Sequence, residues 1–172
     1  MIPTADNAGG DSLPLVDEAE FWAIIERAAT PSDLHSELGT LTEDQLLEFE
    51  HHHARYIDQA YTWDLWGAAY VINGGCSDDT FEYFRAALIG RGRDIFERAL
   101  ADPDSMTDVD FDEDEEWEDW MSPTMHVIHA RTGKYGFAGP RESSAPAQPG
   151  GEEWDEDDLP TRFPRLTAKY GS

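Results

Sequence analysis

The sequence predicts an all-α protein, a compact single-domain helical bundle of about six helices with a C-terminal tail docked on the body. Apolar residues recur at intervals of three and four over most of residues 17–132, the spacing that puts side chains on one face of a helix. Capping residues, glycines and prolines divide this region into helix-sized segments. No stretch alternates polar and apolar residues long enough to predict a sheet.

Four helices are expected in the N-terminal half, and the first three have a start signal. Capping boxes open the first and the third at Asp17 and Thr42, where the side chain accepts a hydrogen bond from the amide three residues on. Pro31 ends the first helix and suits the first turn of a short second one. The fourth begins at about Asp64 after a bend and ends at Gly74–Gly75, because glycine permits positive φ there.

The following segment is capped by Ser77 and ends at Asp102–Pro103, with an expected interruption at Gly90–Gly92. A last amphipathic segment is divided by Ser122–Pro123, as cap and first-turn proline, and closes at Gly133.

Composition along the chain predicts four parts. We expect a flexible leader over residues 1–16, a helical domain over 17–138, a linker over 139–151 and an acidic, aromatic tail over 152–172. The tail is too apolar for a disordered segment, so we expect it to pack back on the helical domain. Its apolar residues are Trp154, Leu159, Phe163, Leu166 and Tyr170.

The charge is strongly unbalanced, with 37 acidic residues against 12 basic ones and a formal net charge of −25. Direct binding to nucleic acid or to an anionic membrane surface is disfavoured, because the long-range field repels phosphate. A basic protein partner, a cation or a neutral small molecule remains compatible with this charge. Acidic runs at residues 102–119 and 152–158 are typical of a solvated surface.

Features of the chain ends and of cysteine usage predict a soluble, cytoplasmic protein without a membrane segment. Cys76 is the single cysteine, so no internal disulfide forms. The N-terminal residues lack the basic and apolar regions of a signal peptide. No apolar run approaches the length of a membrane span. No bound cofactor is predicted.

The segment Trp63–Arg85 holds the densest group of chemically useful side chains. Its aromatic rings and the polar residues around its Gly-Gly turn predict a small pocket with aromatic walls. The candidate ligand-binding residues are Trp63, Trp66, Tyr70, Asn73 and Arg85. The candidate catalytic residues are Asp64, Asp78, Asp79 and Cys76. A carboxylate there would act as general base or ligand anchor, and Arg85 would hold an anion, sharing a region with Asp64.

A nucleophilic role for Cys76 has a simpler alternative. A position before a helix N-terminus lowers a thiol pKa, but Asp78 and Asp79 oppose a thiolate. A small buried residue in a tight turn is the commoner explanation.

Histidines and arginines supply two further candidate sites. His126 and His129 share a helix face and could bind zinc with a carboxylate, but no zinc motif accompanies them. We therefore predict no metal site, with these two as the weak candidates. A basic cluster is formed by Arg85, Arg91, Arg93 and Arg98. We expect it to pair with the acidic runs and so to hold the tail, through carboxylates such as Asp157 and Asp158, with anion binding as the alternative.

Three segments resemble a bacterial family known as "domain of unknown function 4240". They are Phe21–Ile25, Trp63–Pro103 and the tail from Trp154 to Leu166. The resemblance implies a small soluble bacterial domain and supports docking of the tail. It transfers no catalytic residues. The sequence departs from the resemblance in the acidic run and at Ser122–Pro123, where a plainer helix is expected.

Three hypotheses of function stay open, and enzymatic activity is less favoured than protein interaction. The first is a protein-interaction or regulatory module, such as an adaptor or an immunity-type protein that masks a basic partner. The charge, the apolar tail and the lack of a complete catalytic constellation favour it. The alternative is a small-molecule enzyme or ligand-binding protein that uses the Trp63–Arg85 turn. A third hypothesis is a DNA mimic that presents the acids of residues 102–119.

Overall fold

Helices make up the regular structure of this protein. The computed structural model describes residues 14–111, 116–136 and 145–171, and within these ranges the only bridge between extended segments is an isolated one, from Thr62 to Gly150. The α-helices are α1 (Glu18–Arg27), α2 (Pro31–Leu38), α3 (Glu43–Gln59), α4 (Trp63–Asn73), α5 (Asp78–Gly90), α6 (Arg93–Ala101), α7 (Pro123–Thr132), α8 (Leu159–Arg162) and α9 (Pro164–Tyr170). Short 3-10 helices are η1 (Pro103–Asp108), η2 (Trp117–Trp120) and η3 (Glu156–Asp158). The prediction of an all-α protein is confirmed.

There are more helices than the six or so that the sequence predicted. Gly92 has a φ of 91° and separates α5 from α6, at the interruption predicted for Gly90–Gly92, because a left-handed residue cannot continue a helix. The tail also folds into helices, with the break between α8 and α9 at Phe163–Pro164.

Helix starts follow the predicted caps with one exception. The side chain of Asp17 accepts from the Glu20 amide at 2.8 Å, and Thr42 forms the complete capping box. Ser77 accepts from the Thr80 amide at 3.2 Å. Ser122 does not cap α7 with its side chain. Its backbone has a φ of 46°, so Pro123 starts α7 without a side-chain hydrogen bond from the preceding residue.

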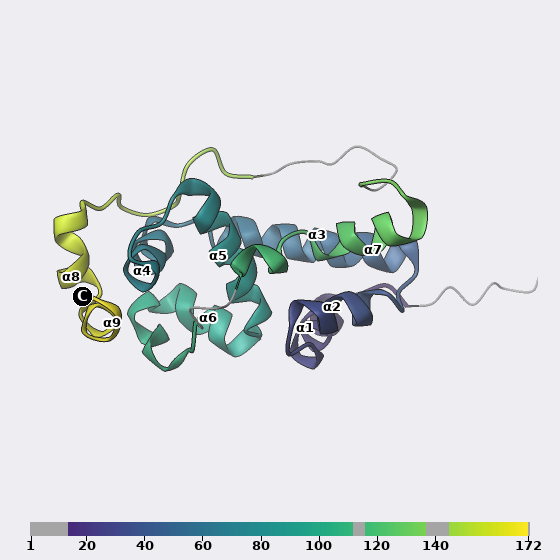
Figure 1. Ribbon diagram of the computed structural model, residues 1–172, viewed down its shortest axis with the longest axis horizontal. Coiled ribbons are helices and arrows are strands. Elements are labelled where there is room, and N and C mark those ends of the chain that lie inside the picture. The colour runs from purple at the N-terminus through teal and green to yellow at the C-terminus, as the bar shows by residue number, and fades with distance from the viewer. Residues whose placement is uncertain (1–13, 112–115, 137–144, 172) are drawn as a thin grey trace, which may run out of the picture.

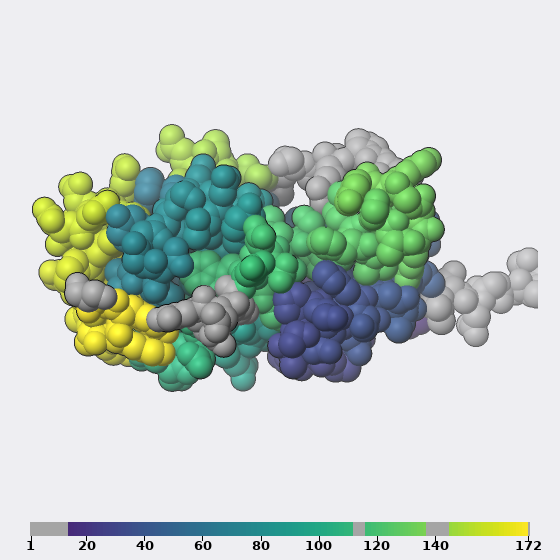
Figure 2. Space-filling view, viewed as in Figure 1, coloured from purple at the N-terminus to yellow at the C-terminus, as the bar shows by residue number. Residues whose placement is uncertain are grey.

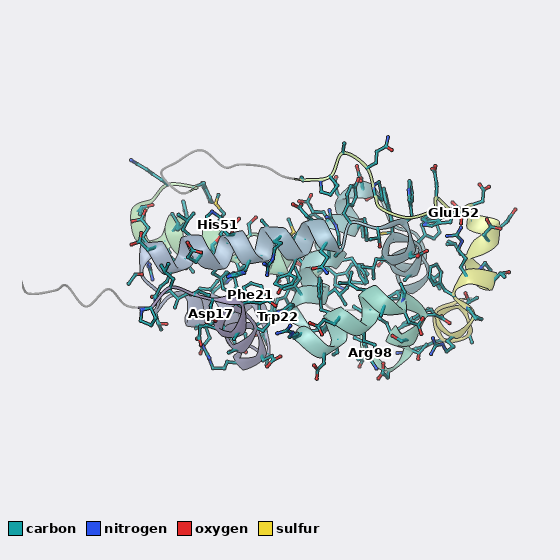
Figure 3. The ribbon with its side chains drawn as sticks, turned by 180° about the vertical axis from the view of Figure 1, so that it is seen from behind. Asp17, Phe21, Trp22, His51, Arg98 and Glu152 are labelled. Atoms are coloured by element: carbon teal, nitrogen blue, oxygen red, sulfur yellow. The ribbon has the colours of Figure 1, made fainter. Side chains whose placement is uncertain are left out.

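Helix α3 runs along the centre of the molecule, with α1 and α2 beside one half of it and α4 and α5 beyond the other (Figure 1). Side chains from α1, α3 and α6 meet in an aromatic core. Phe21 stacks on Tyr56 with a centroid distance of 5.3 Å, and Phe96 meets Tyr56 edge-on at 5.4 Å. Figure 3 shows Phe21 and Trp22 on the side of α1 that faces α3. This core fixes the relative position of the three helices.

The C-terminal tail docks against α4 and η1, as predicted, and forms one end of the molecule (Figure 2). The Trp154 indole Nε1 donates to the Trp63 carbonyl oxygen at 2.8 Å. Phe163 and Leu166 are buried. The approach is close because α4 presents Gly67, where a Cβ would lie 2.7 Å from the Phe163 ring.

Asp104 holds the start of α9. Its buried carboxylate accepts from the Leu166 amide at 2.9 Å and from the Arg165 amide and Nε at 3.1 and 3.0 Å. Burial raises the pKa of Asp104, but the hydrogen bonds from Leu166 and Arg165 outweigh it, and the pKa is lowered overall. The carboxylate is therefore a fixed anion at the N-terminal end of the helix dipole.

The basic cluster pairs with an acidic run, as predicted, but not with the tail acids Asp157 and Asp158. Arg98 forks to Asp108, in the run over residues 102–119, at 2.7 and 2.9 Å. The tail contributes its own cations, including Arg165 and Lys169, which donates to the Thr107 carbonyl at 3.0 Å. We expected arginines of the body to bind carboxylates of the tail. Instead, basic residues of the tail bind acceptors on the body.

The domain boundaries stay predictions. Residues 1–13 of the expected leader and 139–144 of the expected linker lie outside the described residues. Of the described parts, Val16 is buried and Gly150 donates to the Tyr61 carbonyl at 2.9 Å. Within the described ranges, no helix combines the length and the apolar character needed to cross a bilayer.

Candidate functional site

The aromatic residues of the Trp63–Arg85 segment form a stack between α4 and α5. The Trp63 and Trp66 rings are 5.3 Å apart and tilted by 8°, and Trp66 lies 5.0 Å from Phe81 at 10°. The Trp66 indole Nε1 donates to the Cys76 carbonyl at 3.0 Å. These rings therefore join two helices and their connecting turn.

Polar side chains of the same segment bond to the connecting turn and to the C-terminal tail. Asn73 donates to the Gly75 carbonyl at 2.8 Å, and the Tyr70 hydroxyl donates to the Glu156 carboxylate at 2.6 Å. Asp64 pairs with Arg162 of the tail at 3.4 Å. These three contacts hold the turn and the tail. Asp78 and Asp79 are exposed in the first turn of α5.

Arg85 is turned inward and is only 9% exposed. Its Nη1 donates to the Ile57 carbonyl at 2.9 Å, and its guanidinium lies 4.7 Å from the Tyr61 ring and 5.0 Å from the Phe81 ring. Burial lowers the pKa of Arg85, against the effect of Glu82 and other nearby charges. Arg85 and Asp64, which were expected to share a region, have different partners on different elements.

Burial raises the pKa of the Cys76 thiol to about 12. The thiol is therefore protonated at neutral pH, which does not favour a nucleophilic role.

The two candidate zinc ligands contact other rings. His126 of α7 lies 4.8 Å from the His35 ring of α2, and His129 stacks on Tyr135 at 4.0 Å. Across the part of the chain that the structure describes, no three His, Cys, Asp or Glu residues gather in a metal-binding arrangement.

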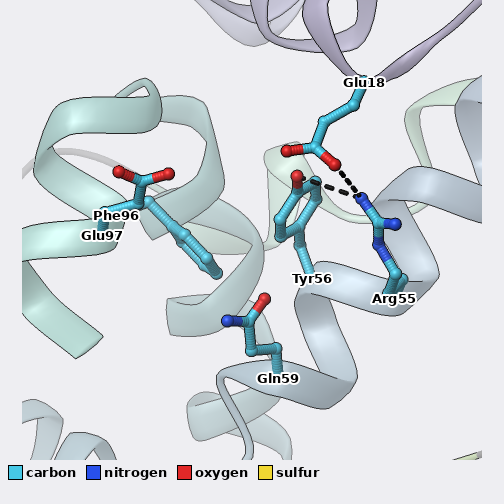
Figure 4. A pocket seen from close by; sticks show the side chains of 6 residues that line it. All are labelled: Glu18, Arg55, Tyr56, Gln59, Phe96 and Glu97. Atoms are coloured by element: carbon cyan, nitrogen blue, oxygen red, sulfur yellow. Dashed lines mark hydrogen bonds and ion pairs between the residues drawn. The ribbon is translucent and has the colours of Figure 1, made fainter. Parts of the chain in front are cut away.

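A pocket of about 330 Å³ lies between α1, α3 and α6, and none of the sequence candidates lines it (Figure 4). Its lining residues are Glu18, Arg55, Tyr56, Gln59, Phe96 and Glu97. Arg55, Tyr56 and Gln59 lie within a little more than one turn of α3, Glu18 begins α1, and Phe96 and Glu97 are adjacent on α6. This concavity is the candidate functional site.

Two buried aromatic rings, Tyr56 and Phe96, make the apolar part of the pocket. The Tyr56 hydroxyl accepts from the Trp22 indole Nε1 at 3.0 Å and from Arg55 Nη2 at 3.1 Å. Figure 4 shows the two rings beside each other, with Gln59 projecting from below. Since both rings pack into the aromatic core, the pocket floor is fixed before any ligand arrives.

Three charged side chains, Glu18, Arg55 and Glu97, form the rim, and Arg93 lies beside it. Arg55 pairs with Glu18 at 3.0 Å, and its guanidinium lies 4.9 Å from the Tyr56 ring centroid. Arg93, next to the pocket, pairs with Glu97 at 2.7 Å and with Glu18 at 3.3 Å. Two carboxylates and two guanidinium groups thus balance each other around an aromatic floor.

The ion pairs keep these groups charged. Hydrogen bonds from Arg55 and Tyr56 lower the pKa of Glu18. Burial lowers the pKa of Arg55, but the hydrogen bonds of Tyr56 and Glu18 raise it overall. The Glu97 carboxylate raises the pKa of Arg93. Each of these shifts is away from neutrality, so Glu18, Arg55 and Arg93 stay charged near neutral pH and do not exchange protons readily.

The sequence held only a partial signal for this site. Arg55 and Gln59 have the spacing that places residues on one helix face, and Arg93 and Glu97 have the same spacing. No spacing shows that α1 and α6 flank the same stretch of α3.

Residues 16–131, more than half of the chain, match the family described as "Protein of unknown function (DUF4240)". The chain belongs to this family. All six residues that line the pocket lie within the DUF4240 match. The first two segments of the resemblance, Phe21–Ile25 and Trp63–Pro103, also lie within it, whereas the tail from Trp154 lies beyond it. No curated protein and no solved structure matches the chain.

Proposed function

We propose that this DUF4240 protein is a cytoplasmic protein-interaction module, of an adaptor or immunity type, whose partner presents a basic segment. The observation that carries this proposal is the pocket between α1, α3 and α6, where fixed charges surround an aromatic floor. A rim of this kind suits recognition of a charged group, because it places charged side chains around an apolar floor.

The directions of the pKa shifts favour binding over catalysis. A general acid or base works best when its pKa lies near the working pH. The resolved pKa shifts of Glu18, Arg55 and Arg93 all go away from that range. Burial also moves the pKa of the Cys76 thiol away from that range, to about 12.

The net charge of the whole molecule indicates which sign of charge the partner should carry. A net charge of −25 attracts cations and repels anions over distances longer than a contact. At the pocket, Glu97 binds Arg93 through one oxygen, and its other oxygen adds a short-range acceptor for a cationic group. A basic protein surface is complementary to both.

The alternative function, a small-molecule enzyme at the Trp63–Arg85 turn, has less support. Its best candidates, Asn73, Tyr70 and Arg85, bond to groups of the same chain.

The test titrates the full-length chain with a short peptide of alternating lysine, arginine and glycine, and with a matched peptide in which glutamate replaces the basic residues. At physiological ionic strength, about 0.15 M, we expect saturable one-to-one binding of the basic peptide alone. Amide hydrogen exchange should slow in α1, α3 and α6. Equal affinity for both peptides, or protection confined to other helices, contradicts the proposal.

A further inference from the structure

We infer that the pocket between α1, α3 and α6 receives an arginine side chain of the partner. The inference rests on the proposed function and specifies its anchor. The incoming guanidinium would lie above the apolar floor of the pocket and bond to Glu97 and Gln59 at the rim.

The pocket already shows how its lining holds a guanidinium group. Arg55 lies over the Tyr56 ring at 4.9 Å while it bonds to the Glu18 carboxylate at 3.0 Å. A planar cation over an aromatic face with a carboxylate at its edge is the arrangement that favours arginine. Phe96 stands beside Tyr56 across the pocket (Figure 4), and because its ring is fully buried it supports the floor and presents no open face to a ligand.

Two acceptors on the rim remain open to a ligand. Glu97 binds Arg93 through Oε1 at 2.7 Å, and its other oxygen accepts no hydrogen bond from the described residues. Gln59 is exposed at the end of α3, and its side-chain amide bonds to none of the described residues. A guanidinium carries five N–H donors in a planar fork, so it has a donor for either acceptor.

An anion is a poorer occupant than a cation. The two cations at or beside the rim, Arg55 and Arg93, are already neutralised by Glu18 and Glu97. The rim is therefore close to neutral, and the field of the whole chain, with its net charge of −25, decides in favour of a positive group.

Arginine fits better than lysine because its charged group is flat and weakly hydrated. A lysine ammonium is a compact, strongly hydrated point charge, whereas the flat guanidinium is weakly hydrated and stacks on rings. The two buried rings give little compensation for stripping water from an ammonium group. A volume of about 330 Å³ lies at the lower end of small-ligand pockets and leaves room for one long side chain.

The test uses the full-length chain and a neutral peptide of glycine and serine with blocked ends and one central arginine. Its lysine counterpart and L-argininamide are the comparison probes. The readout is the NMR shift of the Gln59 side-chain amide, with Gln45 as internal reference because it is held by the Thr42 amide and the Pro14 carbonyl. We expect the arginine peptide to shift Gln59 but not Gln45, and to bind about fivefold or more tightly than the lysine peptide.

Two pocket variants should move the affinity in opposite directions. Glu97→Gln removes an acceptor charge and should weaken binding of the arginine peptide by about tenfold, and Gln59→Glu should strengthen it by a similar factor. Glu37→Gln is the matched control, because it removes the same charge from an ion pair of similar length, 2.8 Å to Arg27, away from the pocket. It should change the affinity by less than about twofold. Unchanged NMR shifts outside α1, α3 and α6 verify the fold of each variant.

The outcomes separate this inference from the proposed function. If the basic peptide binds but Glu97→Gln behaves like Glu37→Gln, or arginine and lysine peptides bind equally, the arginine anchor is wrong and the basic partner stands. If L-argininamide binds as tightly as the peptide, the occupant is a free small molecule instead of a partner side chain. If no basic peptide binds, the proposed function itself fails.

Discussion

Gly67 controls how closely the tail approaches α4. A Cβ at this position would lie 2.7 Å from the Phe163 ring and 3.0 Å from the Trp154 indole nitrogen. Both groups are held by other contacts, since Phe163 is buried and Trp154 donates to the Trp63 carbonyl. Neither ring can therefore move without loss elsewhere.

Gly67→Ala should lower the free energy of unfolding by about 1–3 kcal/mol, because overpacking forces the tail or α4 to shift. Urea denaturation followed by circular dichroism measures the change. Gly150→Ala is the control, since a Cβ there meets nothing closer than 3.9 Å, and its effect should stay within about 0.5 kcal/mol. Equal stability of the two variants would show that the tail is not tightly seated on α4.

At the level of single residues, local sequence rules were informative about backbone and less so about chemistry. Asp17, Thr42 and Ser77 cap their helices as predicted, because a cap depends on residues three apart. Cys76 also precedes a helix, yet burial governs its pKa. Burial is a property of the assembled structure, which the local sequence does not reveal.

At the level of elements, the sequence predicted the helices better than their neighbours. The pocket combines residues from the start of α1, the end of α3 and the middle of α6, and no local pattern indicates that these three segments meet. The partners of the tail were unpredictable for the same reason. Arg165 binds Asp102 and Asp104, a pairing across about sixty positions of the chain.

Helices α2 and α7 pack through a pair of imidazoles, His35 and His126, whose rings are 4.8 Å apart. Burial lowers the pKa of His35, with a further lowering from His126 and an opposing effect from Asp119. A histidine whose pKa is lowered in the folded state stabilises the fold above its unfolded pKa of about 6.5. That contribution is lost as the pH falls below 6.5 toward the folded value.

We therefore expect α7 to loosen when the pH is lowered from about 7.5 to about 5.5. Hydrogen exchange, corrected for the intrinsic effect of pH, should show lost protection in α7 before α4 and α9. In a His35→Phe variant this selective loss should shrink. If His35→Phe leaves the pH profile of α7 unchanged, the imidazole pair is not responsible.

At the level of the whole molecule, unpaired negative charge outweighs ion pairing. Even if all 12 basic residues were paired, 25 of the 37 acidic residues would keep an unmatched charge. Salt weakens individual ion pairs, but it also screens the mutual repulsion of the acids. The imbalance makes the second effect the larger one.

Adding sodium chloride from about 0.05 M to about 0.5 M should consequently raise the Tm by several degrees. Differential scanning calorimetry measures this directly. Near the isoelectric pH the same addition should have little effect, because the net charge is then close to zero. A Tm that falls with salt at neutral pH would mean that the ion pairs dominate.

The docked tail also has a practical consequence for defining this domain. The family match stops at residue 131, but Leu159, Phe163 and Leu166 belong to the same hydrophobic core as Leu65 and Ala68. A fragment trimmed to the matched segment would expose an apolar face of α4 to solvent. An exposed apolar face of this kind promotes aggregation. The smallest unit worth expressing therefore extends through Tyr170.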